Sequence, residues 1–318
     1  MLSGWGSGKY SGDTFPHDMS DEQVSQLKKR YRHVREEFYT KTGMDVVTPD
    51  NVEDFVNRHK TLGIRWALQE QFSGSGRTSA EAVSRGISTL FPIDLRYGWD
   101  LRNPEHQRKI DQVRENLRPL VKMSSPDCRL WSCATNANDK SVLQAGRHEE
   151  VGMLEWLVQD NAAQAKGGRG YINENGLTSH IWTQSPLAQN ADLPGNLRQR
   201  GDGCSHGLTT SLGEPVLKPY RLDANFPLPQ TARRCPGHGE AEHQRLQGQD
   251  TNRTTVYSHK MCRSLVRDII TFLDDKHTAY VVGACPDWTF PVSLGIVWDR
   301  LVEPWYQHNR LQTQATEH

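Results

Sequence analysis

The sequence predicts an α/β fold in which a mostly parallel sheet carries helices on both of its faces. From about residue 66 onward, short apolar stretches typical of strands alternate with longer stretches typical of helices. This alternation is the signature of parallel strands joined by crossover helices. Polar and glycine-rich loops follow several of the apolar stretches, and ligands of such sheets bind beyond the carboxyl ends of the strands. We therefore expect the functional site at these loops.

Length and composition are those of one principal domain with extensions. The chain has 318 residues, with 38 lysines and arginines against 38 aspartates and glutamates. At zero formal net charge, any contact with nucleic acid or a membrane has to come from local patches. No apolar run is long enough to span a bilayer, and residues 1 to 6 lack the pattern of a signal peptide. We expect a soluble intracellular protein, nuclear or cytoplasmic, without a membrane partner; the sequence leaves its oligomeric state open.

The N-terminal extension, residues 1 to 60, is expected to be partly helical. Ser20-Asp21-Glu22-Gln23 has the form of a capping box, and apolar residues then recur at helical spacing through Tyr39. Other positions of this helix carry several lysines and arginines. A solvated face is the main interpretation of these charges, and a phosphate-contacting patch is the alternative. Residues 1 to 19 are rich in Gly and Ser, which predicts poor order.

Residues 61 to 183 are expected to form the core of the fold. Strands are predicted at residues 66 to 68, 87 to 94, 120 to 123 and 171 to 172. Helices are predicted at residues 78 to 85, 104 to 117 and 142 to 158, the second of them opened by proline at its first position. The loops at the strand ends therefore belong to this segment.

The remaining chain is expected to be irregular and rich in loops. Gly, Pro, Gln, Asn and Arg crowd residues 184 to 255, where only residues 215 to 222 look extended. We interpret this region as a substrate-binding or lid region. A helix at residues 254 to 273 and a polar tail after about residue 306 follow, so residues 256 to 318 are expected to form a C-terminal helix and tail.

A glycine-rich loop, FSGSG at residues 72 to 76, separates the first predicted strand from the first core helix. Glycine allows the backbone to pass close to a ligand, and the N-terminus of a helix favours anionic or polar groups. The loop is no phosphate-binding P-loop, because no Gly-Lys-Ser or Gly-Lys-Thr follows it, and Ser79 replaces the third glycine of the dinucleotide fingerprint. Alone, it is also compatible with an ordinary turn.

Two acids and a cysteine stand in the next three loops. Asp94 ends the second strand, where a carboxylate accepts hydrogen bonds from both ribose hydroxyls of a nucleoside cofactor or caps a helix. Asp100, in GWDL, has the position to bond an adenine amine. Cys128, in SSPDCRLWS at residues 124 to 132, follows the third strand. A thiol near helix N-termini can have a depressed pKa and act as a nucleophile; a buried structural cysteine is the alternative.

The order of these loops resembles that of the class I S-adenosylmethionine-dependent methyltransferases, and most closely that of the DNA cytosine-5 methyltransferases. Five stretches match motifs of that family in the family's order: EQFSGSG (70 to 76), PID (92 to 94), GWDL (98 to 101), SPDCRLWS (125 to 132) and NENG (173 to 176). The resemblance implies a Rossmann-like class I methyltransferase sheet that binds S-adenosylmethionine. The cofactor contacts that it implies are Glu70, Phe72, Gly74, Gly76, Asp94 and Asp100.

The resemblance also implies a nucleic-acid substrate, with DNA as the expected form and cytosine C5 as the target atom. In this chemistry a thiolate adds to C6 of a base flipped out of the duplex, and a protonated glutamic acid at N3 assists. Cys128 and Glu174 would hold these roles. Asp127 replaces the family's proline, and its carboxylate should raise the pKa of the neighbouring thiol. The positive charge of Arg129, which replaces glutamine, could offset it.

Two departures keep other functions open. The family's Gln-x-Arg-x-Arg signature is missing, with Lys218 and Arg221 in the nearest counterpart, and little sequence remains for a target-recognition domain. One alternative is a catalytically degenerate methyltransferase-fold module that binds nucleic acid or protein. Another is an amino-group methyltransferase acting on N4 of cytosine or N6 of adenine, because SPDC stands where those families carry a Ser/Asn/Asp-Pro-Pro-aromatic loop.

Residues 66 to 272 also resemble modules within transposable-element polyproteins. The shared stretches include GDGCSHGL (201 to 208), LKP (217 to 219) and CPGHGEAEHQRLQG (235 to 248). This resemblance assigns no activity, but it implies a mobile-element origin and a nucleic-acid setting.

A metal site is predicted within the irregular region. Its candidate ligands are Cys204, His206, Cys235, His238 and His243. Zinc is the metal that such Cys and His sets prefer, and a tetrahedral ion stabilises a segment poor in core-forming residues. Surface histidines and buried thiols are the alternative interpretation. Six cysteines in a chain of this length are too sparse to predict a disulfide scaffold.

Overall fold

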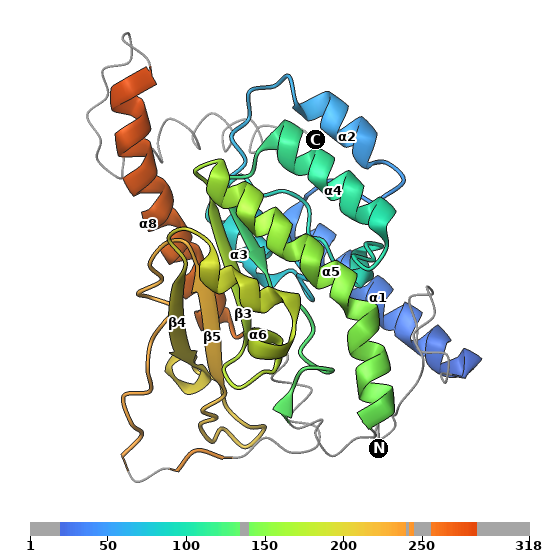
Figure 1. Cartoon of the computed structure of the whole chain (residues 1–318), viewed down its shortest axis with the longest axis vertical. Coiled ribbons are helices and arrows are strands. Elements are labelled where there is room, and N and C mark those ends of the chain that lie inside the picture. Colours follow the sequence, from blue (N-terminus) through green and yellow to red (C-terminus); the bar gives the residue numbers. More distant parts are fainter. Residues whose placement is uncertain (1–19, 134–139, 240–241, 245–255, 285–318) are drawn as a thin grey trace, which may run out of the picture.

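The structure, a computed structural model, describes residues 20–133, 140–239, 242–244 and 256–284. The expectations for residues 1 to 19 and for the tail after residue 306 lie outside these residues. The described chain is built on an open sheet of five strands in the spatial order β1-β2-β3-β5-β4 (Figure 1). The strands are β1 (Leu68–Gln71), β2 (Val121–Ser124), β3 (Gly170–Gly176), β4 (Leu197–Asp202) and β5 (Pro219–Ala224).

The sheet is mixed. β1 pairs with β2 and β2 with β3 in parallel, whereas β5 runs antiparallel to both β3 and β4. The predicted strand at residues 87 to 94 is present as two isolated parallel bridges, of Thr89 with Leu68 and of Ile93 with Gln71. These bridges lie on the edge of β1 away from β2. The predicted α/β class is confirmed, with β1, β2 and β3 parallel on one side of the sheet. β5 overlaps the stretch at residues 215 to 222 that was expected to be extended, but its antiparallel pairing was not predicted.

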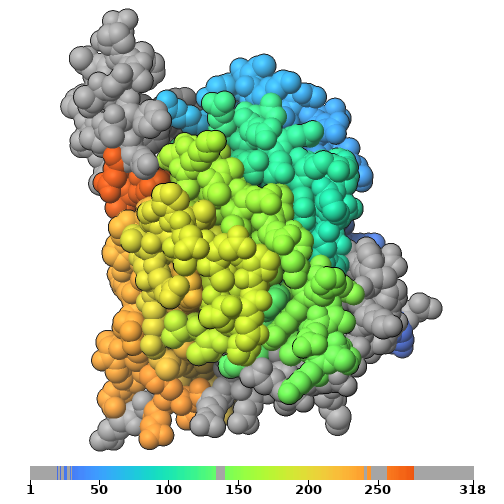
Figure 2. Space-filling view, in the orientation of Figure 1, coloured from blue at the N-terminus to red at the C-terminus, as the bar shows by residue number. Residues whose placement is uncertain are grey.

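Helices cover both faces of the sheet. The main helices are α1 (Asp21–Thr42), α2 (Val52–His59), α3 (Arg77–Ser84), α4 (Pro104–Leu117), α5 (Lys140–Lys166) and α8 (His259–Ala284). α4 and α5 pack over one face with α2 against α4, and residues of α4 and α5 form much of the near surface (Figures 1 and 2). α3 packs on α8 against the other face. No helix within the described residues combines the length and the apolarity needed to cross a membrane.

Short helices occupy the connections. They are η1 (Leu95–Tyr97), α6 (Ile181–Gln184), η3 (Pro186–Asp192) and η4 (Gly203–His206). η1 follows the segment that bridges β1, and η4 follows β4 directly. Both therefore stand at strand ends, where they carry residues of the candidate sites.

The two faces of the central strands differ in chemistry. Because side chains alternate along a strand, Leu68, Met123 and Ile172 share one face and join an apolar cluster with Leu265 and Ile269 of α8. The opposite face carries buried polar side chains, namely Gln71, Lys122, Ser124 and Asn173. Strands that are covered on both faces usually carry apolar side chains on both. The buried polar side chains of this face therefore need hydrogen-bond partners.

Asp160 of α5 is the partner of this polar face. Its Oδ2 accepts hydrogen bonds from Lys122 Nζ at 2.5 Å and from Gln71 Nε2 at 3.0 Å. Its Oδ1 accepts one from Arg114 Nη1 of α4 at 2.6 Å. Burial raises the pKa of Asp160, but attraction by Lys122 and Arg114 outweighs it, so the pKa lies below its usual value. The ionised carboxylate therefore joins two strands to two helices.

Sequence reasoning missed β4 and α2. β4 has the sequence LRQRGD, with its first residues exposed, so no apolar alternation marks it as a strand. α2 is only eight residues long, although it buries Val52, Phe55 and Val56. The region at residues 184 to 255, expected to be irregular, thus contributes β4 and β5 to the sheet. These strands form because backbone pairing with β3 and with each other compensates for a weak apolar pattern.

Candidate functional site

The loop after β1 turns sharply through three residues with positive φ. Phe72, Gly74 and Gly76 have φ values of +53°, +58° and +66°, a region that residues with a Cβ adopt at some cost. A Cβ on Gly76 would lie 2.8 Å from ring atoms of Phe38 in α1, whereas a Cβ on Gly74 would meet only Arg96, at 3.7 Å. Gly76 is thus required by packing against α1, and Gly74 faces more open space.

Glu70, the acid before this loop, binds the first turn of α3. Its Oε2 accepts hydrogen bonds from the backbone N of Ser79 at 2.9 Å and from the Oγ of Ser79 at 2.7 Å. Burial raises the pKa of Glu70 to about 6, although the bonds from Ser79 lower it. A carboxylate at this position satisfies N–H groups that have no partner within the helix. Glu70 therefore fixes the geometry of the glycine loop.

Asp94 connects the glycine loop to the next loop. Its Oδ2 accepts a hydrogen bond from the backbone N of Gly74 at 3.0 Å. Its Oδ1 accepts bonds from the backbone N of Arg96 at 3.0 Å and from Nη1 of Arg96 at 2.9 Å. The guanidinium of Arg96 in turn lies over the ring of Tyr31 in α1, 5.4 Å from its centroid. Asp94, the residue predicted to bind the ribose hydroxyls, thus lies beside the glycine loop. Its carboxylate oxygens already accept hydrogen bonds from Gly74 and Arg96.

Asp100 forms a bidentate ion pair with Arg102. Nε of Arg102 donates to Oδ1 at 3.0 Å, and Nη2 donates to Oδ2 at 3.1 Å. The backbone N of Arg102 also donates to Oδ1 at 3.0 Å. Asp100 is buried, and its carboxylate shapes the turn before α4. An adenine amine at this position would compete with Arg102 for the same oxygens.

α1 lies across the glycine loop. Phe38 packs edge-to-face on Tyr39 and on Tyr97, with ring centroids 5.3 and 5.4 Å apart. Tyr97 belongs to η1, the turn that Asp94 caps. Burial raises the pKa of Tyr39 to about 12, so its hydroxyl stays protonated at neutral pH. The helix thereby packs the loop after β1 and the loop that contains η1 into one unit.

The loop after β2 is tied to β3 and carries an internal ion pair. Nδ2 of Asn175 donates to the carbonyl of Pro126 at 2.8 Å. Asp127 Oδ1 accepts a hydrogen bond from the backbone N of Arg129 at 2.9 Å, and its Oδ2 accepts one from Nε of Arg129 at 2.5 Å. Both charged side chains are about half exposed. The sequence suggested that the positive charge of Arg129 offsets the negative charge of Asp127, and the two side chains form a direct ion pair.

Cys128 stands on the exposed side of this loop. Desolvation by the surrounding protein raises the pKa of its thiol to about 11, and the charges of Asp127 and Glu174 add to the rise. Lys218, which lies just before β5, lowers this pKa. The thiol is therefore mostly protonated at neutral pH, and the charge of Lys218 favours its ionised form.

Glu174 of β3 is buried and held by two hydroxyl groups. The Tyr257 hydroxyl donates a hydrogen bond to its carboxylate and lies 2.6 Å from Ser125 Oγ, which also bonds Glu174. Burial raises the pKa of Glu174, although these bonds and the charge of Lys218 lower it. The charges of Glu174 and Lys218 both act on the thiol of Cys128, and we refer to these three side chains as the Cys128 cluster.

This cluster lies beside the glycine loop. The backbone N of Ser125 donates to the carbonyl of Gln71 at 3.2 Å, so the loops after β1 and β2 begin next to each other. β1 has β2 on one side and the bridges of Thr89 and Ile93 on the other. After β1 the chain first runs along one side of this strand, at Thr89 and Ile93, and then returns as β2 on the other side. Such a reversal is the switch point at which α/β sheets bind ligands.

Ser125 and Tyr257 are site residues that sequence reasoning missed. Ser125 lies in the same loop as Cys128 and directly follows β2, so its position next to a strand end could have identified it. Tyr257 lies 83 residues from Glu174 in the chain, within the helix predicted at residues 254 to 273 but ahead of His259, where α8 begins. Only the packing of α8 on the sheet brings it to the carboxyl end of β3.

Two cysteines and two histidines form a compact cluster beyond β4. The ligand atoms of Cys204, Cys235, His238 and His243 all lie within 4.8 Å of one another. Nε2 of His243 is 3.3 Å from each Sγ, and Nε2 of His238 is 3.3 Å from Cys235 Sγ. Ligands bound tetrahedrally at zinc distances of about 2.0–2.3 Å stand roughly 3.5 Å apart. This cluster could therefore hold a metal ion.

His206 does not join this cluster. It is buried, with Nε2 2.8 Å from the carbonyl of Thr231 and Nδ1 3.5 Å from Ser264 Oγ. Four of the five predicted ligands thus come together. Asp202, the last residue of β4, supports them by accepting a hydrogen bond from the backbone N of Cys235 at 2.9 Å.

No protein-family model, curated protein or solved structure matches the chain.

Replacing Gly76 by alanine should destabilise the protein more than replacing Gly74. Both glycines have positive φ, so the backbone strain of the two alanines should agree within about 1 kcal/mol. Only the alanine at position 76 would collide with Phe38. We expect its free energy of unfolding, measured by chemical denaturation, to fall by about 1–3 kcal/mol more. Equal losses would mean that α1 does not pack on the loop as described.

Proposed function

We propose that this protein is an S-adenosylmethionine-dependent methyltransferase acting on nucleic acid, with cytosine C5 of DNA as the target and Cys128 as the nucleophile. One arrangement carries the proposal: Cys128 follows β2, Glu174 lies near the carboxyl end of β3, and Lys218 acts electrostatically on both, beside the glycine loop after β1. A base flipped into this site would meet a thiol, an acid and the cofactor from three adjacent strands.

Glu174 has the properties that a proton donor to N3 of cytosine requires. It is buried, and burial raises its pKa, which favours the protonated form. A neutral carboxyl group can donate a hydrogen bond to N3 and so make C6 more electrophilic. Tyr257 and Ser125 hold the carboxyl group in position.

Cys128 forms the covalent bond in this proposal. Its thiolate would add to C6 while the proton of Glu174 is shared with N3, and S-adenosylmethionine beside the glycine loop would supply the methyl group to C5. Solvent water would then take the C5 proton, and cleavage of the C6–S bond would restore the ring and release the Cys128 thiolate. Because the pKa of the thiol is about 11, most of it is protonated at neutral pH. The reaction therefore depends on the positive charge of Lys218, which lowers that pKa.

A degenerate methyltransferase-fold module that binds nucleic acid or protein is the second candidate. Two contacts favour it, because Arg102 engages both oxygens of Asp100 and Arg96 engages Asp94. A nucleoside would have to share or displace these partners. A methyltransferase directed at amino groups, N4 of cytosine or N6 of adenine, would use the same glycine loop without needing Cys128.

We propose zinc as the metal of the cluster formed by Cys204, Cys235, His238 and His243. Two thiolates and two imidazoles are a tetrahedral zinc set. The chain around Cys235 and His238 is mostly exposed or half-buried, so little apolar burial holds it. A bound ion would supply that stabilisation directly, which makes the site structural.

Calorimetry with S-adenosylmethionine and its demethylated product separates the catalytic candidate from the degenerate one. We expect the wild type to bind both, and Asp94→Asn to bind at least about tenfold more weakly because a charged hydrogen bond to ribose is lost. Arg102→Gln is the matched control, since it frees the Asp100 carboxylate and should leave binding unchanged or tighter. Absence of binding by folded wild-type protein would exclude the cofactor.

An oligonucleotide that contains 5-fluorocytosine should form a covalent adduct with the protein in the presence of the methyl donor, because fluorine at C5 blocks the elimination step. We expect Cys128→Ser to abolish the adduct and Cys133→Ser, which removes another exposed thiol, to retain it. Adduct formation should accelerate from pH 7 to pH 9, since the thiolate fraction of a group with a pKa of about 11 rises over this range. Methylation by Cys128→Ser would instead favour the amino-group reaction.

Purified protein should contain one zinc ion per chain by elemental analysis. Cys235→Ser should lose the ion because it removes one of four ligands, whereas Cys133→Ser should keep it. A chelator should lower the Tm of the wild type and leave that of Cys235→Ser unchanged. Retention of the metal by Cys235→Ser, or protein that folds without stoichiometric metal, would contradict the assignment.

A further inference from the structure

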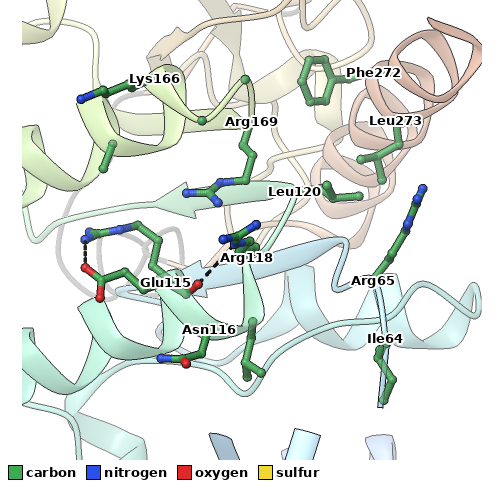
Figure 3. A pocket seen from close by; sticks show the side chains of 16 residues that line it. Ile64, Arg65, Glu115, Asn116, Arg118, Leu120, Lys166, Arg169, Phe272 and Leu273 are labelled. Carbon is green, nitrogen blue, oxygen red and sulfur yellow. Dashed lines mark hydrogen bonds and ion pairs between the residues drawn. The ribbon is translucent and has the colours of Figure 1, made fainter. Parts of the chain in front are cut away.

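A cavity opens at the end of the sheet opposite the glycine loop. Its volume is about 950 Å³, and it is lined by the ends of α4 and α5, the residues just before β1 and β2, and one turn of α8 (Figure 3). These segments surround the amino ends of the parallel strands. Sites for small organic ligands have volumes of roughly 300–1,000 Å³, so the cavity has the size of a ligand site.

Cationic side chains dominate the lining. Those on the lining are Arg65, Arg114, Arg118, Lys166 and Arg169, and the acidic side chain among them is Glu115. The negative C-terminal ends of α4 and α5 attract cations, which accounts for a positive charge at each helix end. Arg114 is in addition bound to Asp160 and Asp111.

Arg118, which follows α4, and Arg169, which follows α5, both line this cavity, and Figure 3 shows both side chains on its lining. Nε of Arg169 donates to Gln164 Oε1 at 2.7 Å, and Nε of Arg118 donates to the carbonyl of Glu115 at 3.3 Å. Burial lowers the pKa of Arg169, and the nearby positive charges, including that of Arg118, lower it further. A bound anion would offset the repulsion among these positive charges.

The turn after α5 passes close to the guanidinium group of Arg169. A Cβ on Gly167 would lie 3.2 Å from the guanidinium carbon of Arg169, so any side chain there would press on this group. Gly168, the next residue, has a φ of +69°, a conformation that favours glycine. The backbone of this turn therefore lines the cavity without side chains that would fill it.

We propose that this cavity binds the phosphate groups of a nucleotide. Guanidinium groups present planar pairs of donors that match phosphate oxygens, and Arg118 and Arg169 offer them from two separate segments of the lining. Leu120, Phe272 and Leu273 form an apolar wall on the same cavity, against which a base can pack. The site lies at the other end of the strands from Cys128, so it does not rest on the proposed methyl transfer. The phosphate can belong to a free nucleotide or to a polynucleotide strand.

Calorimetry at low salt with pyrophosphate, ATP and a short single-stranded DNA tests this site. The double variant Arg118→Gln, Arg169→Gln should bind about 100-fold more weakly than the wild type, from about tenfold for each lost charged hydrogen bond. The matched control is Arg58→Gln, Arg108→Gln, which removes two exposed arginines of α2 and α4 outside the cavity lining and should bind like the wild type. Thermal unfolding without ligand establishes that both variants fold.

Binding of pyrophosphate and ATP that is lost only in the cavity variant would support a free nucleotide as the ligand. Binding of DNA alone, lost in the same variant, would support a polynucleotide strand. Equal binding by the two double variants, or no binding of any of the three probes by the wild type, would overturn the proposal.

Discussion

The buried carboxylate of Asp160 is the interaction on which the arrangement of the sheet depends. A charge in a protein interior costs several kcal/mol unless its hydrogen-bonding capacity is filled, and here β1, β2 and α4 all contribute donors. Slipping β2 by one residue would turn Lys122 to the apolar face under α8. One register is therefore strongly favoured, and it makes β1 and β2 end side by side, with Gln71 opposite Ser124.

The two ends of the sheet differ in how their charges are compensated. At the carboxyl end, three loops repeat an Asp-x-Arg pattern in which each acid binds the arginine two residues later: Asp94 with Arg96, Asp100 with Arg102 and Asp127 with Arg129. In each of these loops the charge of the acid is balanced by that of the arginine, and the ion pair helps to fix the conformation of the loop. At the amino end, arginines from separate segments gather around one cavity. Long-range attraction for anions should thus be stronger at the amino end.

Sequence reasoning found the residues that stand next to a strand and missed those that arrive from elsewhere in the chain. Gly74, Asp94 and Cys128 each follow an apolar stretch, and such stretches mark strands. The Cys and His ligands were found by residue type, but spacing could not reveal that His206 turns inward to a backbone carbonyl. The contact of Tyr257 with Glu174 and the basic cavity exist only once α8 and the helix ends have packed, so no local pattern encodes them.

The positions of Cys204 and Cys235 along the chain give the metal cluster an influence beyond its own loops. Cys204 follows β4 and Cys235 follows β5, so the whole of β5 lies between them. An ion bound by both would close residues 204 to 235 into a ring. This ring would contain β5, the strand between β3 and β4. Ring closure removes conformations from the unfolded chain. A bound ion would then make the pairing of β5 depend on metal availability and on the redox state of the two thiols.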